Sequence, residues 1–326
     1  MPSAMKNKSR IEAIDLARGV ALAAMIVFHF AWDLEFFGYA PAGMTRETGW
    51  VLFARGIASS FLFLVGVSLF LAHKDGIRSR SFLKRLAMVG AAAIAITVAT
   101  WFATPQGFIF FGILHHIALA SVLGLLFLRM PALLTTIAAI LVILAPSYLR
   151  HGFFDHPALW WVGLSSTNPP ANDYVPLFPW LGAVLLGMAA AKLAWGAGLF
   201  AQLAEWRPGG WSRPARLAGR HSLAVYLIHQ PVLIGAIWLF ALVFPPQPRI
   251  MPGDFTRACQ SECVTVRDEA FCRAYCACML EEIERAGLSE AMWQAERDAT
   301  VTATIERLAF ECSIESESPV ELENEP

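Results

Sequence analysis

Seven long apolar stretches constrain the fold of this chain more than any other feature. They cover residues 13–32, 51–72, 86–104, 109–128, 132–149, 177–196 and 221–244. A helix of about 20 such residues crosses the hydrocarbon core of a bilayer. Only 16% of the residues are charged, and this share is well below that of a soluble domain. The sequence therefore predicts an all-α fold, a polytopic membrane helix bundle of about seven spans.

Lysine and arginine residues cluster in three segments of the chain and predict its orientation. No small-residue cleavage site follows the first apolar stretch, so we interpret it as a true span rather than a signal peptide. By the positive-inside rule, all three clusters lie in the cytoplasm. An odd number of spans then places the C-terminal segment outside. The clusters are Lys6, Lys8 and Arg10; Lys74, Arg78, Arg80, Lys84 and Arg85; and Arg207, Arg213, Arg216 and Arg220.

A change in composition near residue 248 predicts the domain boundaries. Residues 1–248 contain every apolar stretch and form the expected transmembrane domain. Residues 249–314 are polar and contain all six cysteines, which predicts a small Cys-rich, extracytoplasmic helical domain. Residues 315–326 are strongly acidic and predict a disordered tail.

The cysteines predict disulfides, because an even set confined to one extracytoplasmic segment is typical of them. Two pairs are spaced at i and i+4, on one face of a helix each. Antiparallel helices would favour Cys259–Cys276 and Cys263–Cys272, leaving Cys278 and Cys312 to pair. Six cysteines allow 15 connectivities, so this pairing stays open. A zinc site is the alternative, but it needs a cytosolic tail, and the tail has no histidine.

Four ionisable residues follow one stripe of the first apolar stretch. Arg18 and His29 are eleven residues apart, so they share a helix face about 16 Å apart along the axis. Asp33 lies one turn beyond His29 and could fix its tautomer in a proton-transfer dyad. Arg18 could pair with Asp15, one turn before it, or hold a ligand phosphate. The simpler alternative is that Arg18 reaches the membrane interface and Asp33 belongs to a loop.

Further polar residues in later stretches are also site candidates. His115 and His116 are adjacent, so a helix directs only one of them into the bundle. Ser222, Tyr226 and His229 are spaced at i, i+4 and i+7 and form one stripe. For His229, a hydrogen bond between helices is a serious alternative. No nucleotide fingerprint and no zinc-helix pattern occurs, so we expect neither a metal nor nucleic acid.

The stretch "RIEAIDLARGVALAAMIVFHFAWDLEFFGY" resembles the opening of bacterial relatives of heparan-α-glucosaminide N-acetyltransferase. More broadly, it resembles the transmembrane acyltransferases that include the acyltransferase-3 family. In that group the first membrane helix carries Arg, ten residues and then His, which Arg18 and His29 match. The segments "FLFLVGVSLFLA", "FGILHHIALA", "FPWLGAVLLG" and "GRHSLAVYLIHQPVL" follow in the expected order. The resemblance covers about residues 10–245.

The resemblance implies an acyltransferase that moves an acetyl group from cytosolic acetyl-CoA to an extracytoplasmic glycan or amino sugar. His29 would be the base or the transient acyl carrier, and Arg18 would lie on the acyl-CoA side. From charge alone, Arg78, Lys84 and Arg85 are expected to bind CoA phosphates. The expected location is the bacterial inner membrane, with membrane lipid as a partner, a cytoplasmic N-terminus and a periplasmic Cys-rich C-terminus.

A transporter or proton-coupled carrier is the alternative function. Intramembrane Asp, Arg and His residues also mark transport paths. Transporters commonly contain inverted repeats, and the two halves of this chain show no clear repeat. A redox-sensing or scaffold protein, in which the cysteine tail carries the function, is a third hypothesis.

Overall fold

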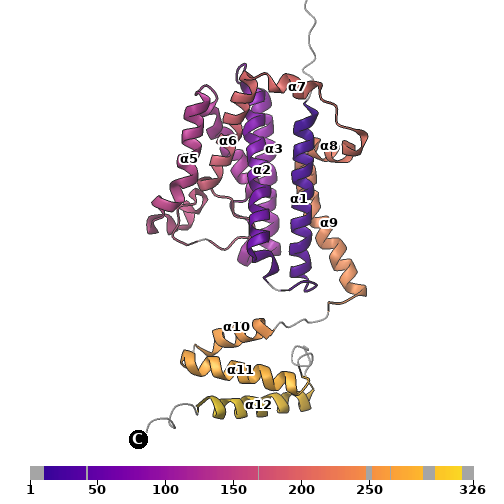
Figure 1. Ribbon diagram of the computed structural model, residues 1–326, viewed down its shortest axis with the longest axis vertical. Helices are drawn as coiled ribbons and strands as arrows, with labels where there is room; N and C mark the ends of the chain where they lie inside the picture. The colour runs from indigo at the N-terminus through magenta and orange to yellow at the C-terminus, as the bar shows by residue number, and fades with distance from the viewer. Residues whose placement is uncertain are drawn as a thin grey trace, which may run out of the picture. The chain divides into compact units, whose positions relative to one another are not determined.

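The fold is a helical membrane bundle followed by a small disulfide-bonded helical region (Figure 1). The computed structural model describes residues 11–41, 43–167, 169–246, 252–264, 266–288 and 298–317. Six of its helices are long and apolar enough to cross a membrane, which confirms the predicted fold class. These helices are α1 (Glu12–Phe36), α2 (Thr48–His73), α3 (Ser79–Ala103), α5 (Ala132–Leu149), α6 (Leu177–Gly196) and α9 (Ser222–Val243).

The remaining expected span, 109–128, is shorter than predicted. Helix α4 covers Ile113–Gly124 and continues only as a 3₁₀ turn, Leu125–Phe127. The preceding residues are held extended by a returning loop: the N–H of Asn172 donates to the carbonyl of Gly107 (2.9 Å), and that of Val175 donates to Phe111 (3.1 Å). This docking replaces the first helical turn that the apolar sequence predicts.

Helices α2 and α6 cross with their backbones in contact. A Cβ on Gly66 would overlap the carbonyl oxygen of Val184, and one on Gly187 would overlap that of Phe63. Small residues commonly allow such close approach in membrane bundles. Leu62 and Leu185 are buried in the core beside this crossing. The crossing forms a scaffold to which α4 and α5 add.

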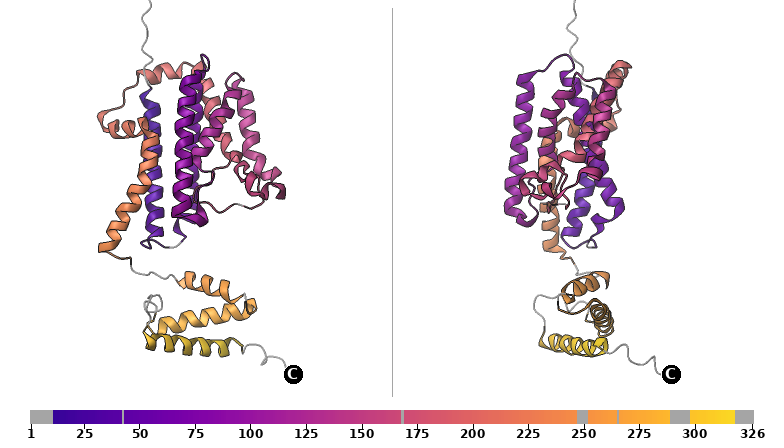
Figure 2. Two further views of the ribbon diagram at one scale, coloured as in Figure 1. Left: turned by 180° about the vertical axis from the view of Figure 1, so that it is seen from behind. Right: turned by 90° about the vertical axis from the view of Figure 1, so that its left-hand side faces the viewer.

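Helix α1 makes a similar close contact with the short helix α8 (Arg213–Arg220). A Cβ on Gly19 would overlap the carbonyl oxygen of Ala215, and a Cβ on Gly219 would overlap that of Asp15. An ion pair between Arg216 and Glu12 joins the same two helices. Another short helix, α7 (Leu199–Glu205), lies across one end of the bundle (Figures 1 and 2).

The chain divides into two compact units, residues 1–30 with 47–234, and residues 31–46 with 235–326. The expected boundary between residues 248 and 249 lies outside the described residues. Helix α12 (Ala299–Glu317) extends three residues past the expected boundary at 314. The rest of the predicted acidic tail, 318–326, lies outside the described residues.

The Cys-rich region forms three stacked helices, α10 (Pro252–Cys263), α11 (Glu269–Arg285) and α12 (Figure 2). The buried side chains of Met279, Ile283 and Leu308 form its small core. Two disulfides join α10 to α11, and a third joins α11 to α12, so the predicted disulfide bonding is confirmed. The pairs are those that helical geometry favours: Cys259–Cys276, Cys263–Cys272 and Cys278–Cys312.

Candidate active site

A pocket of about 530 Å³ opens within the bundle between α1, α2, α3, α4 and α9. Three guanidinium groups line it, those of Arg18, Arg85 and Arg220. Tyr226 and Ser222 add hydroxyl groups, most of the other lining side chains are apolar, and the lining contains no carboxylate. This combination suits an anionic ligand that also carries an apolar arm.

The contact between α1 and α8 brings two of these arginines onto one pocket. Arg18 precedes Gly19, and Arg220 follows Gly219, so the glycine contact sets how far apart their helices lie. The guanidinium of Arg18 donates to the Ser68 hydroxyl and lies 3.5 Å from the Asp15 carboxylate. Asp15 is itself buried. The predicted Arg18–Asp15 pair is therefore present in the structure.

Two histidines from distant parts of the chain meet beyond the pocket. The rings of His29 on α1 and His229 on α9 have centroids 5.0 Å apart. Nδ1 of His229 lies 2.6 Å from the carbonyl oxygen of Tyr226. That nitrogen therefore donates, and Nε2 is the acceptor of the neutral ring. Nε2 is buried, and no residue in the described part of the chain bonds to it.

Tyr226 connects the pocket to this histidine pair. Its ring lines the pocket and lies 5.7 Å from the ring of His229, measured between centroids. His29 is not part of the pocket lining. Tyr226 thus belongs to the pocket lining and also lies beside His229, which packs near His29.

Asp173 is a residue of this site that sequence reasoning missed. Its carboxylate accepts the N–H of Ile113 (2.9 Å), the first residue of α4, and hydrogen-bonds the hydroxyl of Tyr226. A Cβ on Gly112 would overlap this carboxylate, so a larger residue there would displace the Asp173 side chain. Burial raises the pKa of Asp173 above its usual range. The loop "PPANDYVP" carries no motif that would single out this residue.

The remaining predicted residues of α1 and α4 lie away from the pocket lining. Asp33 is fully buried on α1 and belongs to the second compact unit, so its pairing with His29 stays a prediction. His115 accepts the N–H of Gly112 (3.2 Å) through Nδ1, and its Nε2 lies 3.1 Å from the hydroxyl of Thr97. His116 is fully buried, and neither of its ring nitrogens has a hydrogen-bond partner among the described residues. The ring of His115 is thus held by hydrogen bonds, whereas that of His116 is not.

The three basic residues expected to bind phosphate are placed differently from one another. Arg85 lines the large pocket, and Arg78 lines a smaller neighbouring one. Lys84 is exposed and lines neither. Arg220 and His221 also line the large pocket. The sequence predicts only a cytoplasmic location for Arg220 and no role for His221. Both residues lie at the start of the predicted span 221–244, and this position could have identified them as site candidates.

Fold and site together define a polytopic membrane protein with a cationic pocket whose lining residue Tyr226 lies beside a half-buried histidine pair. The family model for heparan-alpha-glucosaminide N-acetyltransferase, catalytic, matches residues 10–231, or 222 of the 326 residues, and the chain belongs to this family. Neither the curated proteins nor the solved structures contain a match. The family uses acetyl-CoA as its acetyl donor.

Proposed function

We propose that this protein takes an acetyl group from cytosolic acetyl-CoA and transfers it to an amine or hydroxyl of an extracytoplasmic glycan or amino sugar. The observation that carries the proposal is the arginine-lined pocket, whose lining residue Tyr226 lies beside His229, which in turn packs near His29. The family match supplies the chemistry. The basic clusters support a cytoplasmic N-terminus. We place the protein in the bacterial inner membrane.

The pocket residues fit the donor. Coenzyme A combines phosphate groups with a long, weakly polar arm that ends in the reactive thioester. Arg18, Arg85 and Arg220 would hold phosphates through charge-assisted hydrogen bonds. The apolar side chains of Val65 and Leu227 would contact the arm. This assignment places the thioester toward Tyr226, at the end nearest the histidines.

The histidine pair supplies the proton chemistry. An acceptor amine or hydroxyl loses a proton as its bond to the acetyl carbon forms, and the departing thiolate gains one. A neutral imidazole can take the first proton. His29 would do so as the base, or would carry the acetyl group between donor and acceptor. The buried Nε2 of His229 has no hydrogen-bond partner among the described residues and would orient the reacting groups.

The experiment is acetyl transfer by the purified protein in detergent, with radiolabelled acetyl-CoA as donor and glucosamine as acceptor probe. The proposal predicts labelled N-acetylglucosamine that depends on the protein. It also predicts that Arg220→Gln weakens acetyl-CoA binding about tenfold, the usual scale for one lost charged hydrogen bond. No binding of acetyl-CoA by the wild-type protein would overturn the proposal.

A further inference from the structure

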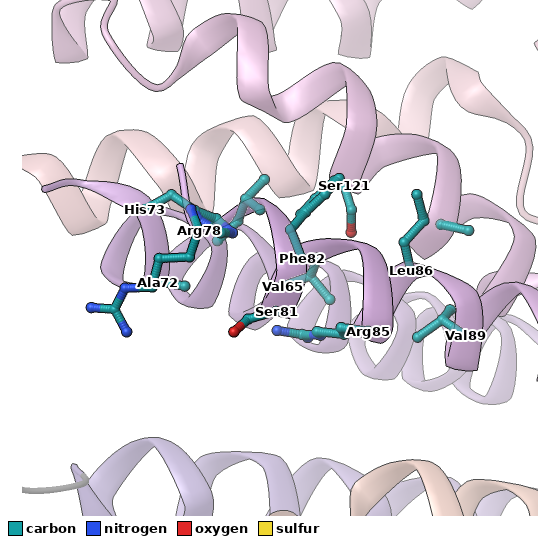
Figure 3. A pocket seen from close by; sticks show the side chains of 12 residues that line it. Val65, Ala72, His73, Arg78, Ser81, Phe82, Arg85, Leu86, Val89 and Ser121 are labelled. Carbon is teal, nitrogen blue, oxygen red and sulfur yellow. The ribbon is translucent and has the colours of Figure 1, made fainter. Parts of the chain in front are cut away.

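A second, smaller pocket of about 140 Å³ lies between α2, α3 and α4 (Figure 3). Its polar lining consists of His73, Arg78, Ser81, Arg85 and Ser121, and the other lining residues are apolar. The lining includes no carboxylate. The volume is roughly ten times the minimum for a single water. The pocket therefore has room for a small polyatomic group and offers it only basic and hydroxyl side chains.

The two arginines of this pocket have no carboxylate partner among the described residues. Across the described ranges, neither Arg78 nor Arg85 forms an ion pair. Arg85 lies in the second turn of α3, within the basic cluster that precedes the predicted span 86–104. Such a site gains stability when an anion enters it.

The wall beside these arginines is fixed. His73 is 7% exposed, and its Nδ1 accepts the N–H of Arg78 (3.3 Å). Its ring packs edge to face on Phe82, with centroids 5.6 Å apart. Arg85 follows Ser81 by one helical turn, and its side chain runs back along α3 toward that hydroxyl (Figure 3). Arg78, Ser81 and Arg85 all line this pocket, and Arg85 lies beside the Ser81 hydroxyl (Figure 3).

Arg85 also lines the larger pocket, as do Val65 and Val89. The two pockets therefore share a wall. A ligand whose reactive end occupies the larger pocket could place a second charged group in the smaller one. An acyl chain of a lipid could equally pass along this wall, since most of it is apolar.

We propose that the smaller pocket is a phosphate-binding subsite, formed by Arg78, Ser81 and Arg85. Its ligand is a phosphate ester, either a nucleotide phosphate of the donor or the headgroup phosphate of an anionic lipid. The first source rests on the proposed function, whereas the second does not. Lys84 and Arg80 lie on the same helix but line neither pocket, so they provide matched controls.

The test measures the binding of two probes to the full-length protein in a phosphate-free detergent. One probe is CoA, compared with 3′-dephospho-CoA, and the other is short-chain phosphatidylglycerol. The variants are Arg78→Gln and the control Lys84→Gln, and both should keep the wild-type melting temperature because Arg78 and Lys84 are exposed. We expect Arg78→Gln to weaken the binding of one probe about tenfold. Lys84→Gln should change the affinity for neither probe by more than about twofold.

The two sources give different results. If the phosphate is that of the donor, Arg78→Gln weakens the binding of CoA much more than that of 3′-dephospho-CoA and leaves lipid binding unchanged. If the phosphate is that of a lipid, Arg78→Gln weakens only the binding of phosphatidylglycerol. The subsite is refuted if Arg78→Gln matches Lys84→Gln for both probes. Failure of the proposed function gives a different result, because the wild-type protein would then bind no CoA. The phosphatidylglycerol measurement alone would then decide whether the subsite binds phosphate.

Discussion

Gly19 of α1 and Gly219 of α8 meet backbone to backbone, and this contact sets Arg18 and Arg220 on the lining of one pocket. A Cβ on Gly219 would lie 2.8 Å from the backbone nitrogen of Gly19 and would also overlap the carbonyl oxygen of Asp15. The neighbouring atoms are backbone, so they cannot turn aside. The cationic pocket thus depends on two residues that have no side chain.

Gly219→Ala should therefore damage both stability and donor binding. Forcing a methyl group into a closely packed contact costs about 1–3 kcal/mol. It would also move α8 away from α1 and weaken acetyl-CoA binding. Thermal unfolding and calorimetric titration measure the two effects. Gly210→Ala is the matched control, because a Cβ there meets no atom within 4 Å. Equal behaviour of the two variants would contradict the role of this contact.

His29→Ala should lower the rate of acetyl transfer by about 10²–10⁴-fold, the usual contribution of an acid–base group. Acetyl-CoA affinity should stay near the wild-type value, because His29 does not line the pocket. Steady-state kinetics and titration separate these effects. His156→Ala, at an exposed loop position, should leave both unchanged. A large loss of affinity with an unchanged rate would place His29 in donor binding instead.

Asp173→Asn should change how stability depends on pH. The raised pKa of Asp173 means that the folded protein holds this proton more tightly than the unfolded chain. The charged form is therefore disfavoured by folding, and stability falls as pH rises from the ordinary pKa of 3.8 through the folded value. An amide cannot ionise, so the melting temperature of the variant should rise relative to the wild-type protein between pH 4 and 7.

Asp155 provides the control for this measurement, because its pKa is shifted in the opposite direction. Hydrogen bonds from Ser165 and Ser166 lower the pKa of Asp155 below 3.8. Its contribution is present above that value and is lost only as pH falls below it. The difference in melting temperature between Asp155→Asn and the wild-type protein should thus stay constant between pH 4 and 7. A constant difference in melting temperature for Asp173→Asn as well would show that folding does not shift the pKa of Asp173.

Replacing Cys278 and Cys312 together by alanine should release α12 from α11. Their bridge spans 34 residues of sequence, and loss of such a bridge costs about 2–4 kcal/mol. Limited proteolysis should then cleave α12 faster than in the wild-type protein. Ser261→Ala, at an exposed position of α10, should not change this rate. Non-reducing peptide mapping should recover all three pairs, and free thiols would contradict this arrangement.

Local pattern predicts the long helices well. The bounds of α5 and α6 coincide with the apolar stretches 132–149 and 177–196, each of which directly follows a proline. Helix α4 departs from its pattern because a loop more than 60 residues away holds the start of the predicted stretch extended. Apolar periodicity reports membrane length, but it does not report which loop returns to dock on a helix end.

The site is less accessible to sequence reasoning, because its contacts join distant segments. Helical spacing correctly pairs Arg18 with Asp15, three residues apart. It cannot show that His229 packs against His29 from 200 positions along the chain. Arg220 joins Arg18 only through the glycine contact, and Asp173 reaches Tyr226 only because its loop folds back over α4. Spacing within one helix predicts neighbours on that helix alone.

The most direct test of the central claim is acetyl transfer across a sealed membrane. The protein is reconstituted in one orientation into vesicles, with labelled acetyl-CoA outside and glucosamine enclosed. The orientation is fixed by protease access to the N-terminus. When the N-terminus faces the acetyl-CoA, we predict labelled N-acetylglucosamine inside the vesicles and none with His29→Ala. Labelled product that forms only when donor and acceptor share one compartment would contradict transfer across the membrane.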